Sequence, residues 1–306
     1  MPQAYVFTEY GGPETQEFRD VDMPTPGPGE LLVDVRAAGV NPADWKIRQG
    51  YLREVVALDP PAVIGSEVAG VVRAVGKDVD SFSVGDEVLG GVAPGSGGYA
   101  EYALVTAEQA AKKPTQVSYT DAAALPVAAA TAYDGVHQLD LQPGQVLLVN
   151  GIGGGVGVAA AQIARHLGLT VLGTASPAKA ELVESLGAVH VASGPGVADR
   201  VRQLLPDGVD AILDLVGGES LQAVGALARD GSKVVSAADP GAAADFGGGA
   251  VQRAYSGEVL AAVAQLVADG KLDPHVEDVV PFDRAGEALA AVESGHSRGK
   301  VVISVP

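Results

Sequence analysis

The chain has 306 residues, of which 47% are hydrophobic and 19% are charged. This length and composition indicate about two globular domains and exclude a disordered protein. The net charge of −18 disfavours binding to nucleic acid or to an anionic membrane, because both need a positively charged surface. The chain has no cysteine, which excludes disulfides, thiolate zinc sites and a cysteine nucleophile.

The sequence also lacks the features of a membrane or secreted protein. No apolar run reaches about 18 residues, the length that spans a bilayer. Residues 1–12 have neither the basic start nor the long apolar segment of a signal peptide. We therefore expect a cytoplasmic protein with no transmembrane segment.

The first 120 residues contain short apolar runs separated by clusters of glycine and proline. Strands are expected around Val6 and at residues 31–35, 62–75, 85–89 and 99–105. Short strands at this spacing are typical of a compact β-rich domain or barrel.

The pattern changes near residue 118. Residues 121–133 are rich in alanine and predict a helix that Pro126 breaks or kinks. Strands are then expected at 145–150, 170–174, 189–192, 209–213 and 233–236, alternating with helices at 154–167, 178–186, 197–205 and 220–228. This alternation predicts an α/β domain with a doubly wound parallel sheet. The tail predicts helices at 259–268 and 284–292 and a strand at 300–305, and we expect it to return to the N-terminal domain.

The strongest local signal is the glycine-rich turn between the strand at 145–150 and the next helix. Gly154, Gly155, Val156 and Gly157 form a GGxG variant of the G-x-G-x-x-G pattern. Backbone N–H groups at a helix N-terminus attract anions, and glycines let a pyrophosphate approach the backbone. We expect these four residues to bind a dinucleotide, although a plain tight turn is the alternative. The lysine and Ser/Thr of a P-loop are missing, which disfavours nucleotide triphosphate hydrolysis.

The end of the following strand favours NADP(H) over NAD(H). In NAD-binding folds an acidic residue about 20 positions onward binds the ribose 2′-hydroxyl. Here Thr174, Ser176 and Lys179 come first, and no carboxylate appears before Glu181. A hydroxyl and a lysine suit a 2′-phosphate. Alternatively, Ser176 caps a helix that begins at Pro177, and Lys179 is a solvated surface residue.

Five segments, in this order, resemble a known family. They are residues 39–44 (GVNPAD), 65–72 (GSEVAGVV), 130–133 (ATAY), 151–157 and 299–302 (GKVV). Over essentially the whole chain, their order and spacing resemble the zinc-independent quinone oxidoreductase branch of the medium-chain dehydrogenase/reductase superfamily.

This resemblance implies a GroES-like β-rich catalytic domain, residues 1–121 and 266–306, and a Rossmann NADP(H)-binding domain, residues 122–265. It also implies NADPH as cofactor, a quinone or another α,β-unsaturated carbonyl compound as the small-molecule substrate, and a homodimer.

The residues at the metal positions depart from the zinc-dependent branch. Asn41, Ser66 and Val127 match its ligand positions, and together they make a poor ligand set. The histidines show no metal-ligand spacing; they are His137, His166, His190, His275 and His296. We therefore expect no metal.

The resemblance also suggests the catalytic and substrate-binding residues. It places the turn with Asn41 and Asp44 beside the nicotinamide, although both residue types are also common in turns. Arg48 follows Asp44 by four residues, so we expect that the two can pair on one helical face, in a substrate or a structural role. Thr131 matches a threonine near the nicotinamide ribose. Tyr51 would form an aromatic wall for a planar substrate, or be a surface aromatic residue.

Further cofactor contacts are expected at two strand ends and in the tail. Val216 lies in a strand-end turn at the cofactor edge, and Ser236 ends the next strand. In the tail, Arg298 and Lys300 reach the cofactor or simply begin a strand. Glu67 matches a retained glutamate, for which we expect a structural hydrogen-bonding role.

The reaction implied by the resemblance is hydride transfer from NADPH to a quinone or to the β-carbon of an enone. Negative charge then develops on the carbonyl oxygen, where Asn41, Arg48 or a ribose hydroxyl would stabilise it. Water would deliver the final proton. Two alternatives stay open: an alcohol dehydrogenase-type oxidoreductase and a non-catalytic NADPH-binding protein.

Overall fold

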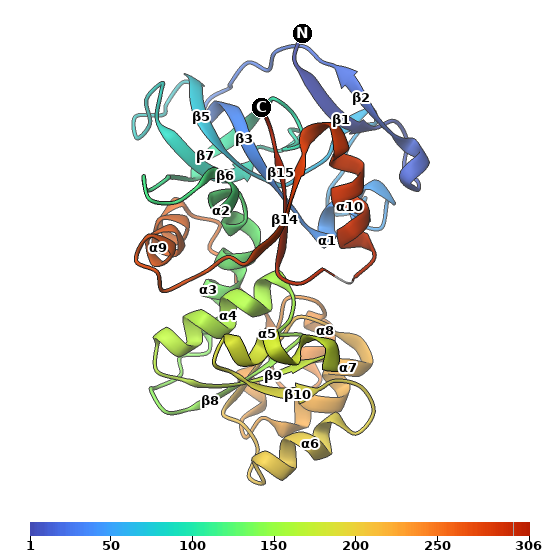
Figure 1. Cartoon of the computed structure of the whole chain (residues 1–306), viewed down its shortest axis with the longest axis vertical. Coiled ribbons are helices and arrows are strands. Elements are labelled where there is room, and N and C mark those ends of the chain that lie inside the picture. The colour runs from blue at the N-terminus through green and yellow to red at the C-terminus, as the bar shows by residue number, and fades with distance from the viewer. Residues whose placement is uncertain (296) are drawn as a thin grey trace. The chain divides into compact units, whose positions relative to one another are not determined.

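The computed structural model describes residues 1–295 and 297–306. It divides into two compact units (Figure 1). Unit 1 comprises Met1–Val127, Tyr255–Ala268 and His275–Pro306, and unit 2 comprises Ala128–Ala254 and Asp269–Pro274. In the described part of the chain, no helix has the length and apolar character needed to cross a membrane.

Unit 1 is built on a six-stranded sheet with the order β14-β15-β3-β5-β6-β7. Its strands are β3 (Glu30–Val40), β5 (Glu67–Val75), β6 (Glu87–Val92), β7 (Tyr102–Lys112), β14 (Val276–Pro281) and β15 (Lys300–Ser304). Because β3 also pairs with β7, the four strands β3, β5, β6 and β7 close into a barrel. Burial alternates along β3 from Val33 to Ala37, as expected for a strand with one face in the core.

Smaller elements complete unit 1. A three-stranded sheet has the order β2-β1-β4, formed by β1 (Gln3–Phe7), β2 (Gln16–Asp20) and β4 (Ala62–Val63). The helices of this unit are α1 (Pro42–Arg48), α2 (Tyr119–Ala123), α9 (Gly257–Ala268) and α10 (Ala285–Glu293). Helix α9 packs on β7, whereas the predicted boundary at residue 265 assigned most of this helix to the Rossmann domain.

The end of the chain supplies an internal strand of unit 1. Strand β15 lies between β14 and β3, parallel to β14 and antiparallel to β3. Figure 1 shows β14, β15 and α10, in red, beside the blue strand β3. Segments that lie far apart in the sequence therefore share one sheet.

Unit 2 contains a six-stranded sheet with the order β10-β9-β8-β11-β12-β13, in which every pairing is parallel. Its strands are β8 (Val146–Asn150), β9 (Thr170–Ala175), β10 (Val189–Ala192), β11 (Ala211–Asp214), β12 (Val234–Ser236) and β13 (Gly249–Ala250). Its helices are α3 (Ala130–Gln138), α4 (Gly155–His166), α5 (Ala180–Ser185), α6 (Val197–Leu204), α7 (Gly218–Val224) and α8 (Pro240–Ala244).

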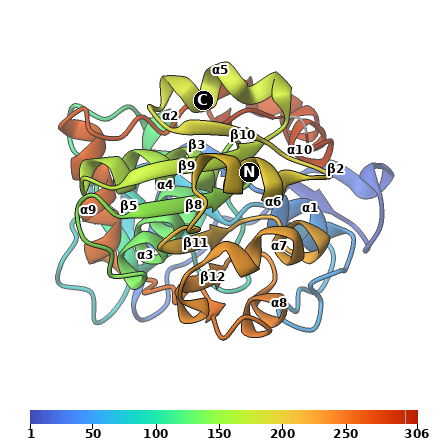
Figure 2. The same ribbon diagram turned by 90° about the horizontal axis from the view of Figure 1, so that it is seen from below.

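The predicted doubly wound sheet is confirmed. From β8 the chain winds through β9 to β10, and it then crosses to β11 and winds the other way (Figure 2). The strand order therefore reverses between β8 and β11, and in such sheets ligands bind outside the carboxyl ends of the strands at this point.

The predicted break at Pro126 is also present. Helix α2 ends at Ala123, and a π-helical turn, Leu125–Ala129, joins it to α3. Proline has no N–H to donate to the preceding turn, which explains why the regular helix is interrupted here.

Candidate active site

Asn41 lies directly after β3 and directly before α1. Its backbone N–H donates to Asp44 Oδ2 over 2.8 Å, which ties the first turn of α1 to the end of the strand. Pro42 is the first residue of the helix, where its missing N–H costs nothing. The local sequence thus fixes the backbone of Asn41, whose side chain is buried.

Asp44 is held by three donors in the interior of unit 1. Besides the Asn41 N–H, it accepts the Ser66 hydroxyl over 2.6 Å and the Tyr99 hydroxyl over 2.9 Å. Burial raises the pKa of Asp44 to about 6, and these hydrogen bonds oppose the rise. Burial likewise raises the pKa of Tyr99 well above its usual value, and the nearby Asp44 carboxylate adds to that rise.

The expected pairing of Asp44 with Arg48 is wrong. The Arg48 guanidinium instead donates to both carboxylate oxygens of Glu293 in α10, over 2.9 and 3.0 Å, and to Gly11 O over 3.1 Å. Arg48 is 1% exposed, so these contacts tie α1 to α10 in the interior. A substrate role for Arg48 stays a prediction, and this burial disfavours it.

Glu67 and Lys300 form a buried ion pair, and the Asn41 side chain beside it contacts both of them. Glu67 Oε1 accepts both Lys300 Nζ and Asn41 Nδ2, each over 2.7 Å. Lys300 Nζ also donates to Asn41 Oδ1 over 2.7 Å and to Val40 O over 3.1 Å. Glu67 Oε2 accepts the Val127 N–H over 2.6 Å. Glu67 has the expected hydrogen-bonding role, whereas the contact of Lys300 with Asn41 was not predicted.

In unit 2, four polar side chains form a row across the carboxyl ends of the strands. The row occupies paired positions at or next to the ends of adjacent strands. Its members, all buried, are Thr174 on β9, Asn150 on β8, Asp214 on β11 and Ser236 on β12. Thr174 Oγ1 donates to Asn150 Oδ1, Asn150 Nδ2 donates to Asp214 Oδ1, and Ser236 Oγ donates to Asp214 Oδ2. This continuous row of hydrogen bonds crosses the point between β8 and β11 at which the strand order reverses.

This row holds the loops that follow the strands. Thr174 Oγ1 accepts the Gly151 N–H, and Asp214 accepts the N–H groups of Val216 and Gly217. Ser236 Oγ accepts the backbone N–H groups of residues 238 and 239. Direct cofactor contacts by Thr174 and Ser236 stay predictions, because both hydroxyls are already engaged in shaping loops.

The glycines of the loop have different tasks. A Cβ on Gly157 would lie 2.5 Å from the backbone of Ile152, so this glycine allows α4 to pack on the loop. A Cβ on Gly154, whose backbone is extended, would have only Gly151 O within contact distance, at 4.0 Å, so the space beside the first turn of α4 is nearly open. The first N–H groups of a helix lack acceptors within the helix, so this open space suits a phosphate group.

Family models match two parts of the chain. Residues 27–115 match the alcohol dehydrogenase GroES-like domain, and residues 186–303 match the zinc-binding dehydrogenase family. A 2-methylene-furan-3-one reductase of Solanum lycopersicum is 34% identical over 98% of this chain and 78% of its own length. The human quinone oxidoreductase is 36% identical over 74% of this chain and 70% of its own. The chain belongs to the quinone oxidoreductase branch of the medium-chain dehydrogenase/reductase superfamily.

Solved structures of this superfamily have the same fold. The quinone oxidoreductase of Coxiella burnetii superposes with a TM-score of 0.89 at 28% identity, covering 100% of this chain and 99% of that one. A mycobacterial protein complexed with NADPH gives a TM-score of 0.87 at 30% identity, over 99% of this chain and 100% of that one. The predicted family, fold class and oxidoreductase activity are thus confirmed, as is a nicotinamide cofactor of the NAD(P)H class.

Three further residues predicted to bind the cofactor, Lys179, Ser176 and Val216, have the following surroundings. Lys179 Nζ donates to Gly153 O over 3.0 Å, so this side chain lies over the loop. Ser176 is exposed and holds the position before the short 3₁₀ turn Pro177–Lys179 that the capping alternative predicted, but its side chain makes no capping hydrogen bond. Val216 is 53% exposed, and its side chain lies against Gly151.

The remaining predicted residues have separate surroundings. Thr131 Oγ1 accepts Arg253 Nη1 over 2.7 Å, and this arginine also pairs with Asp134. Tyr51 is 69% exposed and packs edge-on against the Trp45 ring. Arg298 is exposed, and its backbone N–H donates to a carboxylate of β14. Cofactor or substrate contacts by these residues stay predictions.

Among residues 1–295 and 297–306, no group of three or more His, Cys, Asp or Glu side chains is arranged to hold a metal ion. Four of the histidines belong to this described part, and His296 lies outside it. At the positions that match zinc ligands, Asn41 contacts the Lys300 ammonium and Ser66 donates to Asp44. The side chains present there do not form a zinc site.

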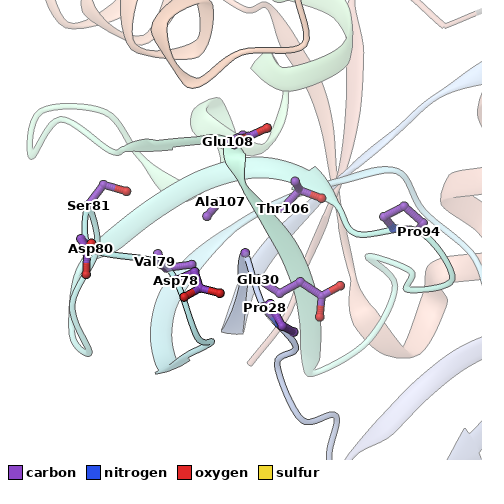
Figure 3. A pocket seen from close by; sticks show the side chains of 11 residues that line it. Pro28, Glu30, Asp78, Val79, Asp80, Ser81, Pro94, Thr106, Ala107 and Glu108 are labelled. Atoms are coloured by element: carbon purple, nitrogen blue, oxygen red, sulfur yellow. The ribbon is translucent and has the colours of Figure 1, made fainter.

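A cavity of about 430 Å³ in unit 1 is distinct from these candidate residues (Figure 3). It is lined by Pro28, Gly29, Glu30, Asp78, Val79, Asp80, Ser81, Pro94, Thr106, Ala107 and Glu108. The lining contains four acidic side chains and no lysine or arginine. It would repel a phosphate-bearing cofactor.

Proposed function

We propose that the protein is an NADPH-dependent reductase that transfers a hydride to quinones or other α,β-unsaturated carbonyl compounds. The observation that carries this proposal is the buried Asn41 amide beside Glu67 and Lys300, at a position that matches a zinc ligand in the zinc-dependent branch. An amide can donate a hydrogen bond to a carbonyl oxygen but cannot replace the Lewis acid that activates an alcohol. A substrate whose C=C bond is already polarised by a carbonyl needs only a hydrogen bond to its carbonyl oxygen.

We assign cofactor binding to unit 2. The open space at Gly154, next to the N-terminus of α4, fits the pyrophosphate, with the N–H groups of Gly155 and Val156 as donors. Lys179 over the loop, and the lack of a carboxylate at residues 174–180, support NADPH over NADH. When bound, this cofactor supplies the hydride.

We assign recognition of the substrate carbonyl to unit 1. Asn41 Nδ2 would donate to the oxygen on which negative charge develops, and its fixed position avoids reorganisation during the reaction. Exposed Tyr51 is a candidate wall for a planar substrate. The closing proton is assigned to water, because the Asp44 carboxyl is already held by three donors.

Turnover with a small substrate panel tests the proposed activity. NADPH oxidation is followed by its absorbance with 1,4-naphthoquinone and 3-penten-2-one, and NADP⁺ reduction is followed with a saturated alcohol. We expect turnover with the quinone and the enone. Zinc-dependent oxidation of the alcohol alone would favour an alcohol dehydrogenase, and tight NADPH binding without any turnover would favour a non-catalytic binding protein.

The cofactor preference is tested at Lys179. The substitution Lys179→Glu places a carboxylate near the expected 2′-phosphate and should weaken NADPH binding at least about tenfold, while NADH binding changes little. Lys271→Glu, an exposed lysine of the same unit, is the charge-matched control. Fluorescence titration measures both cofactors. Equal weakening of NADPH and NADH, or tighter NADH binding by the unmodified protein, would contradict the preference.

The glycine loop is tested with a matched pair. Gly154→Ala adds a methyl group to the open space and should weaken both cofactors while the protein stays folded. Gly157→Ala drives a methyl group into the Ile152 backbone and should lower stability instead. Circular dichroism on heating separates the two effects. Normal cofactor binding by a folded Gly154→Ala protein would exclude this loop as the pyrophosphate site.

A further inference from the structure

We propose that Lys300 is a positioning residue, which together with Glu67 fixes the Asn41 amide so that only an N–H faces the substrate. The proposal rests on the proposed reductase function and deepens it. In this proposal the buried ion pair of unit 1 affects the reaction through Asn41, whose amide it orients.

The two charged groups determine which way round the amide lies. Asn41 Oδ1 faces the Lys300 ammonium, and Asn41 Nδ2 faces the Glu67 carboxylate, each over 2.7 Å. The reversed amide would direct its N–H groups at the ammonium and its oxygen at the carboxylate, and both contacts would be repulsive. Neither charge alone would exclude the reversed amide as strongly as the pair does.

One N–H of the Asn41 amide has no acceptor within the described chain. Lys300 has three N–H donors and three acceptors, namely Val40 O, Asn41 Oδ1 and Glu67 Oε1. The Asn41 oxygen is occupied by the ammonium. Its Nδ2 carries two hydrogens but has a single acceptor, Glu67 Oε1, within the described chain. The amide can therefore offer a ligand a donor, which matches the carbonyl oxygen of a quinone or an enone.

The ammonium also affects the strength of this donor. A cation 2.7 Å from Oδ1 draws electron density toward the amide oxygen and makes the N–H groups more acidic. Burial of the pair limits screening by water. Charge that develops on the substrate oxygen during hydride transfer would then meet a donor that is already oriented and polarised.

Rigid elements hold the cluster in place. Lys300 is the first residue of β15, and its neighbour Val301 pairs with Val40 at the end of β3. Glu67 is the first residue of β5, which pairs with the other edge of β3. Stability alone does not call for such an arrangement, because buried ion pairs can often be replaced by apolar groups without loss.

The test is a kinetic mutant cycle on the enzyme with NADPH and 3-penten-2-one. The variants are Asn41→Ala, the charge-free pair Lys300→Met/Glu67→Gln, and the triple combination. We expect the first two each to lower kcat about tenfold or more while the Kd for NADPH stays within about twofold. The triple variant should be no slower than the slower of the other two, because the charged pair acts only through Asn41.

The outcomes that overturn the proposal differ from failure of the proposed function. Losses that multiply in the triple variant would show that Lys300 and Glu67 act independently of Asn41. A folded charge-free pair with kcat near that of the unmodified enzyme would also overturn it. If the unmodified protein binds NADPH but reduces neither a quinone nor an enone, the proposed function itself fails.

A second variant covers the case in which the charge-free pair does not fold. Lys300→Gln/Glu67→Gln removes both charges but keeps an N–H donor near Asn41 Oδ1 and an acceptor near Nδ2. We expect it to retain more activity than Asn41→Ala and less than the unmodified enzyme, since orientation is kept and polarisation is lost. Activity equal to either limit would contradict the combined role of orientation and charge.

Discussion

Glu67 in unit 1 and Asp214 in unit 2 are both fully buried carboxylates at strand ends, yet their charges are compensated differently. Glu67 contacts a cation, Lys300, at 2.7 Å. Asp214 is held by neutral groups: the Asn150 amide, the Ser236 hydroxyl and two backbone N–H groups of the following turn. One carboxylate has a partner from a distant element, and the other is held by its neighbours in the sheet and by its own loop.

This difference determines how much stability each cluster loses when one partner of its carboxylate is removed. Within the described residues, losing Lys300 would leave the buried Glu67 charge with no cation and only two neutral donors, Asn41 Nδ2 and the Val127 N–H, which is costly. Losing any one donor of Asp214 would leave several others in place, so the cost is spread over them. The ion pair is thus suited to impose an orientation, whereas the neutral row is suited to hold several loops together.

The largest effect is expected from Lys300→Met. It should lower the free energy of unfolding by about 3–5 kcal/mol, because Glu67 loses its cation. The double variant Lys300→Met/Glu67→Gln should recover most of this loss. Denaturant unfolding followed by fluorescence measures both. A double variant as unstable as the single one would show that unpaired charge is not the cause.

Asp44 sharpens the comparison, because it is a buried carboxylate of unit 1 with neutral donors only. Its pKa of about 6 lies above its usual value, so the folded protein binds this proton more tightly than the unfolded chain. The resulting stabilisation is fully present at low pH and is lost as the pH rises through about 6.

The test of Asp44 is the stability difference between the unmodified protein and Asp44→Asn, whose side chain does not titrate. This difference should fall by about 2–3 kcal/mol between about pH 4 and pH 7. Ser66→Ala removes a hydrogen bond that lowers the pKa and should move the fall to higher pH. A difference that does not change with pH would be inconsistent with the raised pKa.

The smallest of the three effects is expected from Asp214→Asn, at about 2 kcal/mol. The single amide oxygen cannot accept all the donors that the two carboxylate oxygens accept, and the new N–H group would face other donors. NADPH binding should weaken as well, since the turn at Val216 loses its anchor. The exposed Asp245→Asn is the control and should stay within about 0.5 kcal/mol of the unmodified protein.

The fold was predictable where it follows from local patterns. Five of the six strands of the parallel sheet were located closely from short, mainly apolar runs that alternate with helical segments. Strand β14 was missed because most of its side chains are exposed, so Val276–Pro281 shows no burial pattern. The two-residue strand β13 and the five-residue helix α8 are too short to show a period.

The candidate site was predictable only in part, for a related reason. Asn41 and the glycine loop lie within recognisable local motifs. The long-range contacts of Asn41 and Arg48 could not be predicted, because Lys300 is 259 positions from Asn41 and Glu293 is 245 positions from Arg48. Only the pairing of β15 with β3 brings Lys300 to Asn41, and no local pattern encodes that pairing.

The position of β15 also sets an order of events in time. The ribosome makes Glu67 233 residues before Lys300, which at typical elongation rates is a delay of roughly 10 to 50 seconds. Throughout that delay residues 37–40 of β3 lack the strand that β15 later provides and are open to pairing with a foreign strand, and the carboxylate of Glu67 has no cation beside it. Unit 1, whose first segment precedes unit 2 in the chain, is therefore completed only after unit 2, when β15 pairs with β3.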